Sequence, residues 1–148
     1  MAIYKPPVVT ILNDHDFELV EPFVFGWEEV TALPLASRQW RITIPAGFSF
    51  DGASVPRVCW TLTGLLPSGV HLGAAAVHDY AYERRGRIIR GEVACLMEGV
   101  WQPQGVVWDR GQCDEMFLRI MRDAGETSWK SRVMFAAVRA FGGVAWNR

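Results

Sequence analysis

The pattern His78-Asp79-x-x-Tyr82 places an imidazole, a carboxylate and a phenol within five residues of otherwise small or apolar sequence. An ionisable pair is costly to bury unless partners compensate it, so the pattern needs a structural or a chemical reason. On a helix, Tyr82 lies one turn after His78, whereas the side chains of His78 and Asp79 point about 100° apart. The two adjacent residues can therefore flank one cleft without stacking on each other.

Two further carboxylates lie in positions that the chain would hold in place. Asp51 opens the segment DGASVP (51–56), in which Gly52 permits a sharp turn and Pro56 fixes the exit of the chain. Asp114 lies in the first turns of a helix expected to start near residue 109. We expect both carboxylates to converge on the His-Asp pair, with the imidazole in hydrogen-bond reach of at least one of them.

This constellation supports two kinds of hydrolytic chemistry. Carboxylates can hold a hard cation while neutral His78 acts as general base on a water molecule. Alternatively, the imidazole and the aspartates ligate a transition metal that activates the water. The candidate catalytic residues are His78, Asp79 and Asp114; the candidate binding residues are Asp51, Ser54 and Tyr82; the candidate metal ligands are Asp51, Asp79 and Asp114. The cation, if the site uses one, would be calcium, magnesium, manganese or zinc.

A purely structural interpretation remains open for the same residues. His78 can donate to Asp51 or Asp114 as a buried tie between helices and loop, with Asp79 capping the turn that follows Asp51. The two interpretations differ in solvent access. A catalytic site needs a cleft beside His78, whereas a tie needs full burial and a partner for every polar atom.

The elements that must position these residues divide into two parts. Short segments rich in β-branched and aromatic residues, separated by turn formers, predict an antiparallel sheet of four or five strands. They are residues 8–12, 17–20, 22–27, 38–44 and 48–50. Alternation in 38–44 predicts that Trp40, Ile42 and Ile44 share the buried face of a strand.

The second part of the chain predicts three helices. They span about 69–84 with Ser68 as cap, 109–123 with a capping box of Asp109 and Gln112, and 128–141 between Thr127 and the pair Gly142-Gly143. Trp129, Phe135, Val138 and Phe141 form the expected core stripe of the last helix. Residues 86–108 are consistent with a short helix or with a pair of strands. The expected fold class is α+β: one domain over 1–148, β-rich in 1–56 and helical in 68–143.

Composition excludes several classes of function. Half of the 148 residues are apolar and 21% are charged, which is typical of a globular chain. The net charge of −1 without a basic block argues against nucleic-acid binding. No apolar run reaches the roughly 18 residues of a membrane span, and no signal peptide is expected. Three widely spaced cysteines without a CxxC motif fit neither a disulfide framework nor a zinc knuckle, and favour a reducing cytoplasm.

Four segments in this order resemble the domain of unknown function 1353 family of tailed phages, prophages and bacteria. They are IPAGFSFDGASVPR, GAAAVHDYAYERR, CDEMFLRIMRDAG and WKSRVMFAAVRAFG, within about residues 38 to 143. The chain departs from the family pattern in a longer stretch from Gly86 to Asp109, and in Cys113, where Ala is common. The family carries no established activity.

The resemblance implies a phage or prophage protein, made in the cytoplasm of a bacterial host and associated with virions. Two functions fit it: a small metal-dependent hydrolase acting on an envelope polymer or lipid, and a non-catalytic virion or tail protein whose partners are other phage structural proteins. More loosely, the helix with His78, Asp79 and Tyr82, together with the later Asp114, resembles the arrangement of residues in secreted calcium-dependent phospholipases. That similarity implies His78 as base, Asp79 as calcium ligand and Asp114 as the residue that orients His78. The disulfide lattice and glycine-rich calcium loop of those enzymes are absent from this sequence.

Overall fold

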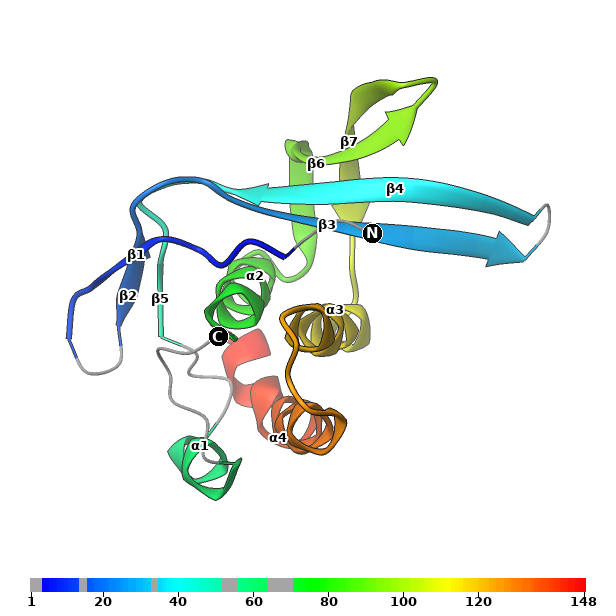
Figure 1. The fold of residues 1–148 in the computed structure, drawn as a ribbon. Helices are drawn as coiled ribbons and strands as arrows, with labels where there is room; N and C mark the ends of the chain where they lie inside the picture. The colour runs from blue at the N-terminus through cyan, green and yellow to red at the C-terminus, as the bar shows by residue number, and fades with distance from the viewer. Residues whose placement is uncertain (1–3, 14–15, 33–34, 52–55, 64–70) are drawn as a thin grey trace.

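The computed structural model describes residues 4–13, 16–32, 35–51, 56–63 and 71–148, and its fold is α+β (Figure 1). The described residues form two antiparallel sheets: the larger one lies above the helices, and the smaller one lies to their left in Figure 1. The helices come mostly from the C-terminal part of the chain. The predicted fold class is thus confirmed. The sequence predicted one sheet, however, and the strands of the described residues form two.

The smaller sheet has three short strands, in the order β1 (Val9–Ile11), β2 (Phe17–Leu19) and β5 (Ser49–Phe50). Phe17 pairs with Phe50 across it, and both side chains are buried. The strand β5 ends directly before Asp51, so this sheet carries the first of the candidate carboxylates to the edge of the core.

The larger sheet has the order β3-β4-β6-β7, and it consists of two long hairpins. Its strands are β3 (Phe23–Ala32), β4 (Leu35–Ile44), β6 (Arg87–Met97) and β7 (Val100–Val107). Ile42 and Ile44 are fully buried and Trp40 is half-buried on the same face, as the alternation predicted. The far end of the β3–β4 hairpin extends well beyond the helical layer (Figure 1).

The described residues also form four helices: α1 (Arg57–Thr63), α2 (Leu72–Glu83), α3 (Arg110–Asp123) and α4 (Ser128–Trp146). The helix α2 packs on α3, and α4 packs on both α3 and α1. Ala74, Ala76 and Val77 are buried, because the small side chains of α2 let its neighbours approach closely. The capping box of Asp109 and Gln112 is present at the start of α3, as predicted.

Several predicted boundaries were wrong. The α2 helix begins at Leu72 with His71 as N-cap; Ser68 and Gly69, the predicted start, lie outside the described residues. For residues 86–108 the sequence left two alternatives open, and the structure shows the second of them, a hairpin of two strands. Gly142 and Gly143 do not end the last helix, because α4 continues through both to Trp146.

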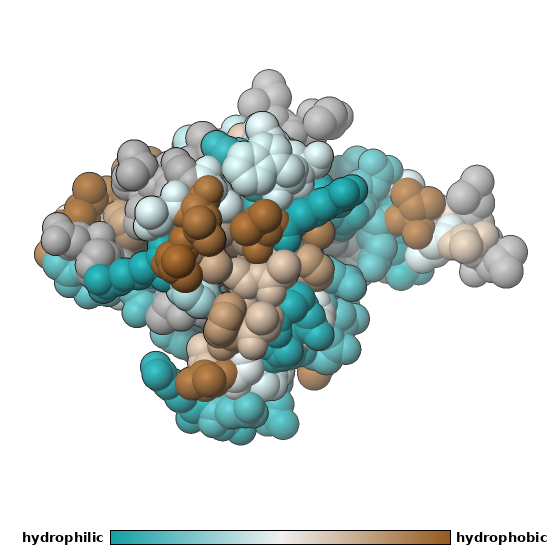
Figure 2. All heavy atoms as spheres, turned by 90° about the horizontal axis from the view of Figure 1, so that it is seen from below, coloured by the Kyte–Doolittle hydropathy of each residue, from teal (hydrophilic) through white to brown (hydrophobic). Residues whose placement is uncertain are grey.

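The predicted core stripe of α4 was also partly wrong. Val138 is fully buried and Phe135 packs against the core, but Trp129 and Phe141 are 56% and 57% exposed. The face of the molecule seen from below carries hydrophobic residues among hydrophilic ones (Figure 2). No helix of the described residues has the length and apolar character that crossing a membrane requires.

Candidate functional site

Asp114 is the centre of a buried hydrogen-bond cluster between α2, α3 and α4. Its side chain is 0% exposed. One oxygen, Oδ1, lies 2.8 Å from His78 Nε2 and accepts a hydrogen bond from the Tyr82 hydroxyl at 2.5 Å. The other, Oδ2, accepts from the Arg139 guanidinium at 2.8 Å. Three donors from two other helices therefore hold one carboxylate, as a buried charge requires.

The electrostatics of Asp114 follow from these partners. Burial alone would raise the pKa of its carboxyl, but the hydrogen bonds from His78, Tyr82 and Arg139 outweigh it and lower the pKa. Asp114 is thus ionised near neutral pH. Because an ionised carboxylate accepts hydrogen bonds and does not donate them, His78 Nε2 carries a proton.

His78 is held by a carboxylate on each side of its ring. Burial favours the neutral imidazole, but hydrogen bonds and charges from Asp114 and Asp79 raise the pKa of His78 above its ordinary 6.5. The second nitrogen, Nδ1, lies 3.9 Å from Asp79 Oδ1. With Nε2 protonated, Nδ1 is the nitrogen that exchanges a proton, and it faces Asp79.

Aromatic rings enclose this cluster. The Tyr82 ring lies 4.0 Å from the His78 ring, and the Phe117 ring contacts His78 edge-on at 5.3 Å. Burial and the bond to Asp114 raise the pKa of Tyr82, so its hydroxyl remains a donor. Gly142 lets α4 approach here, since a Cβ at this position would lie 2.6 Å from the Tyr82 hydroxyl oxygen.

Asp79 and Asp51 lie on the open side of the cluster. Asp79 is 11% exposed, and its Oδ2 accepts a hydrogen bond from the backbone N–H of Asp51 at 3.1 Å. Both residues line a cavity of about 720 Å³ together with Tyr82 and, from α4, Trp146. This volume is in the range of ligand-binding pockets. Asp79 therefore lies between the buried imidazole and a space that a small ligand can occupy.

The structure brings together His78, Asp79 and Asp114, the predicted catalytic residues, and joins Tyr82 to them. Asp51 contacts Asp79 through its backbone, whereas Ser54 lies outside the described residues. The proposed metal ligands do not face one common point: both oxygens of Asp114 bind protein donors, while Asp51 and Asp79 face the cavity. Over the part of the chain that the structure describes, no three His, Cys, Asp or Glu side chains form a metal-binding group.

Two members of the cluster were not identified from the sequence. Arg139 was not among the predicted site residues, but its guanidinium binds the buried Asp114 although 41% of the side chain is exposed. Trp146 follows the glycine pair at which the helix was expected to end, and its ring contacts Tyr82 edge-on at 5.2 Å. The helical spacing of seven residues between Arg139 and Trp146 was the available signal, since it places both on one face of α4.

Cys113 is adjacent to Asp114 but is not a nucleophile. Burial and the neighbouring carboxylates raise the pKa of its thiol to about 12, so it stays protonated at neutral pH. Of the three cysteines, Cys95 and Cys113 are buried and Cys59 is half-buried, and all are free thiols.

Comparison with known sequences identifies the family. The profile described as "Protein of unknown function (DUF1353)" matches residues 27–138, which include all of the helical cluster except Arg139 and Trp146. The chain belongs to the DUF1353 family. The match begins in β3 and ends in α4, so it spans both the larger sheet and the helices.

A bacterial relative of this DUF1353 protein is the uncharacterized protein y4jT of Sinorhizobium fredii (strain NBRC 101917 / NGR234). It is 27% identical over 99 residues, which cover 67% of this chain and 23% of the relative. The matched region thus spans less than a quarter of that longer protein. No solved structure matches this chain.

Proposed function

We propose that this DUF1353 protein is a hydrolase in which His78 is the general base, acting on an ester bond of a bacterial envelope polymer or lipid. One observation carries the proposal: the two nitrogens of the His78 ring have different surroundings. Nε2 is held by the buried Asp114 at 2.8 Å, and Nδ1 faces Asp79 on the wall of the 720 Å³ cavity. An imidazole with one nitrogen fixed by a buried carboxylate and the other facing a carboxylate at a cavity wall is suited to proton transfer.

The proposed reaction begins with a water molecule between Nδ1 and the substrate. Its oxygen attacks the ester carbonyl carbon while its proton passes to Nδ1 of His78. The imidazolium that forms is stabilised by the carboxylates of Asp114 and Asp79, whose charges already raise the pKa of His78. When the tetrahedral intermediate collapses, the alcohol leaves and takes the proton from Nδ1, which restores the neutral ring.

A divalent cation can assist this reaction only from the cavity side. Asp51 and Asp79 line the cavity, as do Asp16 and Glu83, and oxygen ligands of this kind suit calcium or magnesium. Asp114 is not available without loss of its bonds to His78, Tyr82 and Arg139. A cation bound there would polarise the ester carbonyl, and the proton transfer through His78 would be unchanged.

The alternative proposal is that the cluster stabilises the fold of a non-catalytic phage accessory or virion protein. The observation that favours it is burial: His78 is 2% exposed and Asp114 is 0% exposed, and His78 does not itself line the cavity. In this alternative the cavity beside Asp79 is unrelated to any reaction. Origin from a phage or prophage, in either case, is a proposal that rests on the family resemblance.

The test compares hydrolysis by the wild type and by His78→Gln, Asp79→Asn and Glu98→Gln, with p-nitrophenyl butyrate and with phosphatidylglycerol vesicles as substrates. The His78→Gln change should lower the rate by ~10²-fold or more, because the base is lost. Glu98 lies at the tip of the β6–β7 hairpin, away from the cavity, so Glu98→Gln should match the wild type.

Thermal unfolding completes the test. If His78→Gln keeps a wild-type midpoint and loses hydrolysis, the general-base role is supported. Absence of hydrolysis in the wild type, or equal rates in wild type and His78→Gln, would reject it in favour of the structural alternative. Calcium, magnesium, manganese or zinc should raise the midpoint of the wild type but not of Asp79→Asn if a cation binds the folded protein at Asp79.

A further inference from the structure

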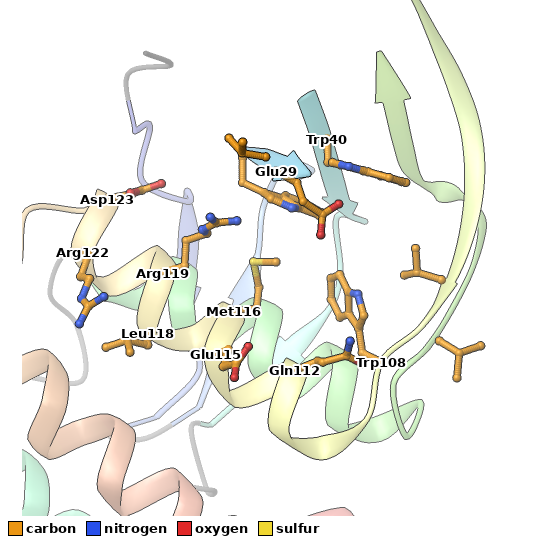
Figure 3. A pocket seen from close by; sticks show the side chains of 14 residues that line it. Glu29, Trp40, Trp108, Gln112, Glu115, Met116, Leu118, Arg119, Arg122 and Asp123 are labelled. Atoms are coloured by element: carbon orange, nitrogen blue, oxygen red, sulfur yellow. The ribbon is translucent and has the colours of Figure 1, made fainter. Parts of the chain in front are cut away.

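A second cavity lies between α3 and the larger sheet, away from the His/Asp cluster. Its volume is about 810 Å³, and it shares no lining residue with the cavity beside Asp79. Side chains from β3, β4 and β7 form one wall and those of α3 form the other (Figure 3). We call it the tryptophan groove, after Trp27, Trp40 and Trp108, which line it.

The three indoles form a rigid aromatic wall. Trp27 stacks on Trp40 with ring centroids 6.3 Å apart and an angle of 13°, and Trp108 contacts Trp27 edge-on at 6.0 Å. Each indole is half-buried, so one part of it packs on the core while another part borders the groove. Aromatic faces preorganised in this way offer apolar contact area without loss of side-chain freedom on binding.

The opposite wall carries polar side chains at helical spacing. Gln112, Glu115 and Arg119 lie along one face of α3, and Arg119 extends toward the sheet (Figure 3). Glu29 faces them from β3. Amide, carboxylate and guanidinium groups each offer two hydrogen-bonding atoms in a plane, which suits neighbouring hydroxyl groups of a ligand.

The charges of the groove nearly cancel. The lining includes three carboxylates, of Glu29, Glu115 and Asp123, and two guanidinium groups, of Arg119 and Arg122. A polyanion such as nucleic acid would meet more repulsion than attraction here, and a polycation would meet the arginines. A ligand with apolar faces and many hydroxyl groups, but little net charge, complements both walls. We propose that the tryptophan groove binds a neutral saccharide chain.

The proposal is independent of the hydrolase reaction, and a binding measurement tests it. In the full chain labelled with ¹⁵N, the indole N–H signals report separately on the seven tryptophans. The probes are neutral tetrasaccharides: chitotetraose, cellotetraose and maltotetraose. At least one should shift the signals of Trp27, Trp40 and Trp108 in a saturable way and leave that of the exposed Trp129 unchanged.

Variants on the rim of the groove sharpen this measurement. Glu115 and Arg119 are exposed, so Glu115→Ala and Arg119→Ala should fold normally and weaken saccharide binding by about tenfold, the loss of one well-placed hydrogen bond. Arg132→Ala, on the exposed face of α4, is the matched control and should bind as the wild type does.

Three results would overturn the proposal. The first is that none of the tetrasaccharides shifts the groove signals at millimolar concentration. The second is binding that Glu115→Ala and Arg119→Ala leave unchanged. The third is a shift of the same indole signals with protein concentration alone, which would show that a second copy of the chain occupies the groove.

Discussion

The two sides of the His/Asp cluster are built from the same residue types but in opposite environments. On the inner side, Asp114 is completely buried, and His78, Tyr82 and Arg139 bind it from neighbouring helices. On the outer side, Asp79 and Asp51 contact each other at the wall of a cavity. His78 lies between them, with one ring nitrogen directed to each side.

This contrast predicts that substitutions on the two sides of the cluster affect different properties of the protein. A buried carboxylate with three donors is costly to disturb, because removal leaves buried donors without an acceptor. A carboxylate at a cavity wall can exchange its partners for water, so its removal costs less and changes mainly what the cavity binds. The inner side should therefore control folding, and the outer side should control function.

Replacement of Asp114 by Ala should produce the largest loss of stability. His78, Tyr82 and Arg139 would lose their common acceptor inside the core, at a cost of ~3–5 kcal/mol in the free energy of unfolding. Urea denaturation of the wild type and of Asp114→Ala measures this loss of stability. Glu115→Ala, at the next and exposed position, should change stability by less than ~0.5 kcal/mol. Equal stability of the two variants would contradict the contrast.

The glycine pair of α4 offers a matched comparison of packing against the cluster. A Cβ at Gly142 would lie 2.6 Å from the Tyr82 hydroxyl oxygen, so Gly142→Ala must displace Tyr82 or α4 and should cost ~1–3 kcal/mol. At Gly143 the nearest atom is Arg110 Nη1 at 3.8 Å, and Gly143→Ala should instead stabilise the helix by ~0.5–1 kcal/mol. Thermal unfolding of both variants measures the two changes in stability. Changes of the same sign would contradict the close packing of Gly142 against Tyr82.

On the outer side, Asp79→Ala should have a smaller effect on folding. It removes the acceptor of the Asp51 backbone N–H at a partly exposed position, at a cost of about 1 kcal/mol. The same urea titration compares it with Asp114→Ala. If Asp79→Ala destabilises the protein as much as Asp114→Ala does, the two sides do not differ in the way described.

The pH dependence of the free energy of unfolding should reflect the titration of both Asp114 and His78. The pKa of Asp114 is lowered by folding, so its contribution is present above the ordinary 3.8 and is lost as pH falls through the lower folded value. The pKa of His78 is raised, so its contribution is full below 6.5 and is lost as pH rises through the higher folded value. Denaturation across pH should therefore give a maximum between these limits. His78→Gln should remove the decline on the alkaline side.

Much of the cluster could be predicted from local sequence, because its parts are local. The His-Asp-x-x-Tyr spacing determines which residues share a face of α2, and the capping box of Asp109 and Gln112 fixes the start of α3 and hence the position of Asp114. A carboxylate partner for His78 was predicted from the cost of burying either group alone, but the sequence did not decide between Asp51 and Asp114.

The parts that could not be predicted depend on tertiary contacts. Gly142 and Gly143 are helix-ending residues by propensity, but packing of α4 on Tyr82 keeps them helical, and Trp146 is thereby brought to the cavity. Arg139 has the appearance of a surface residue, because nothing near it in the sequence shows that Asp114 lies within reach. Trp27 and Trp40 come from two strands and Trp108 from the segment between β7 and α3, so no local pattern predicts their groove.

The most direct test of the central claim is the protonation of the His78 ring, measured by ¹⁵N NMR on histidine-labelled protein across pH. The chain has three histidines, and the His78→Gln variant assigns the signals. We predict that neutral His78 carries its proton on Nε2, and that Nδ1 takes up a proton with a pKa above 6.5. A neutral ring protonated on Nδ1, or a pKa below 6.5, would contradict the assignment of Nε2 to Asp114 and of Nδ1 to the cavity side.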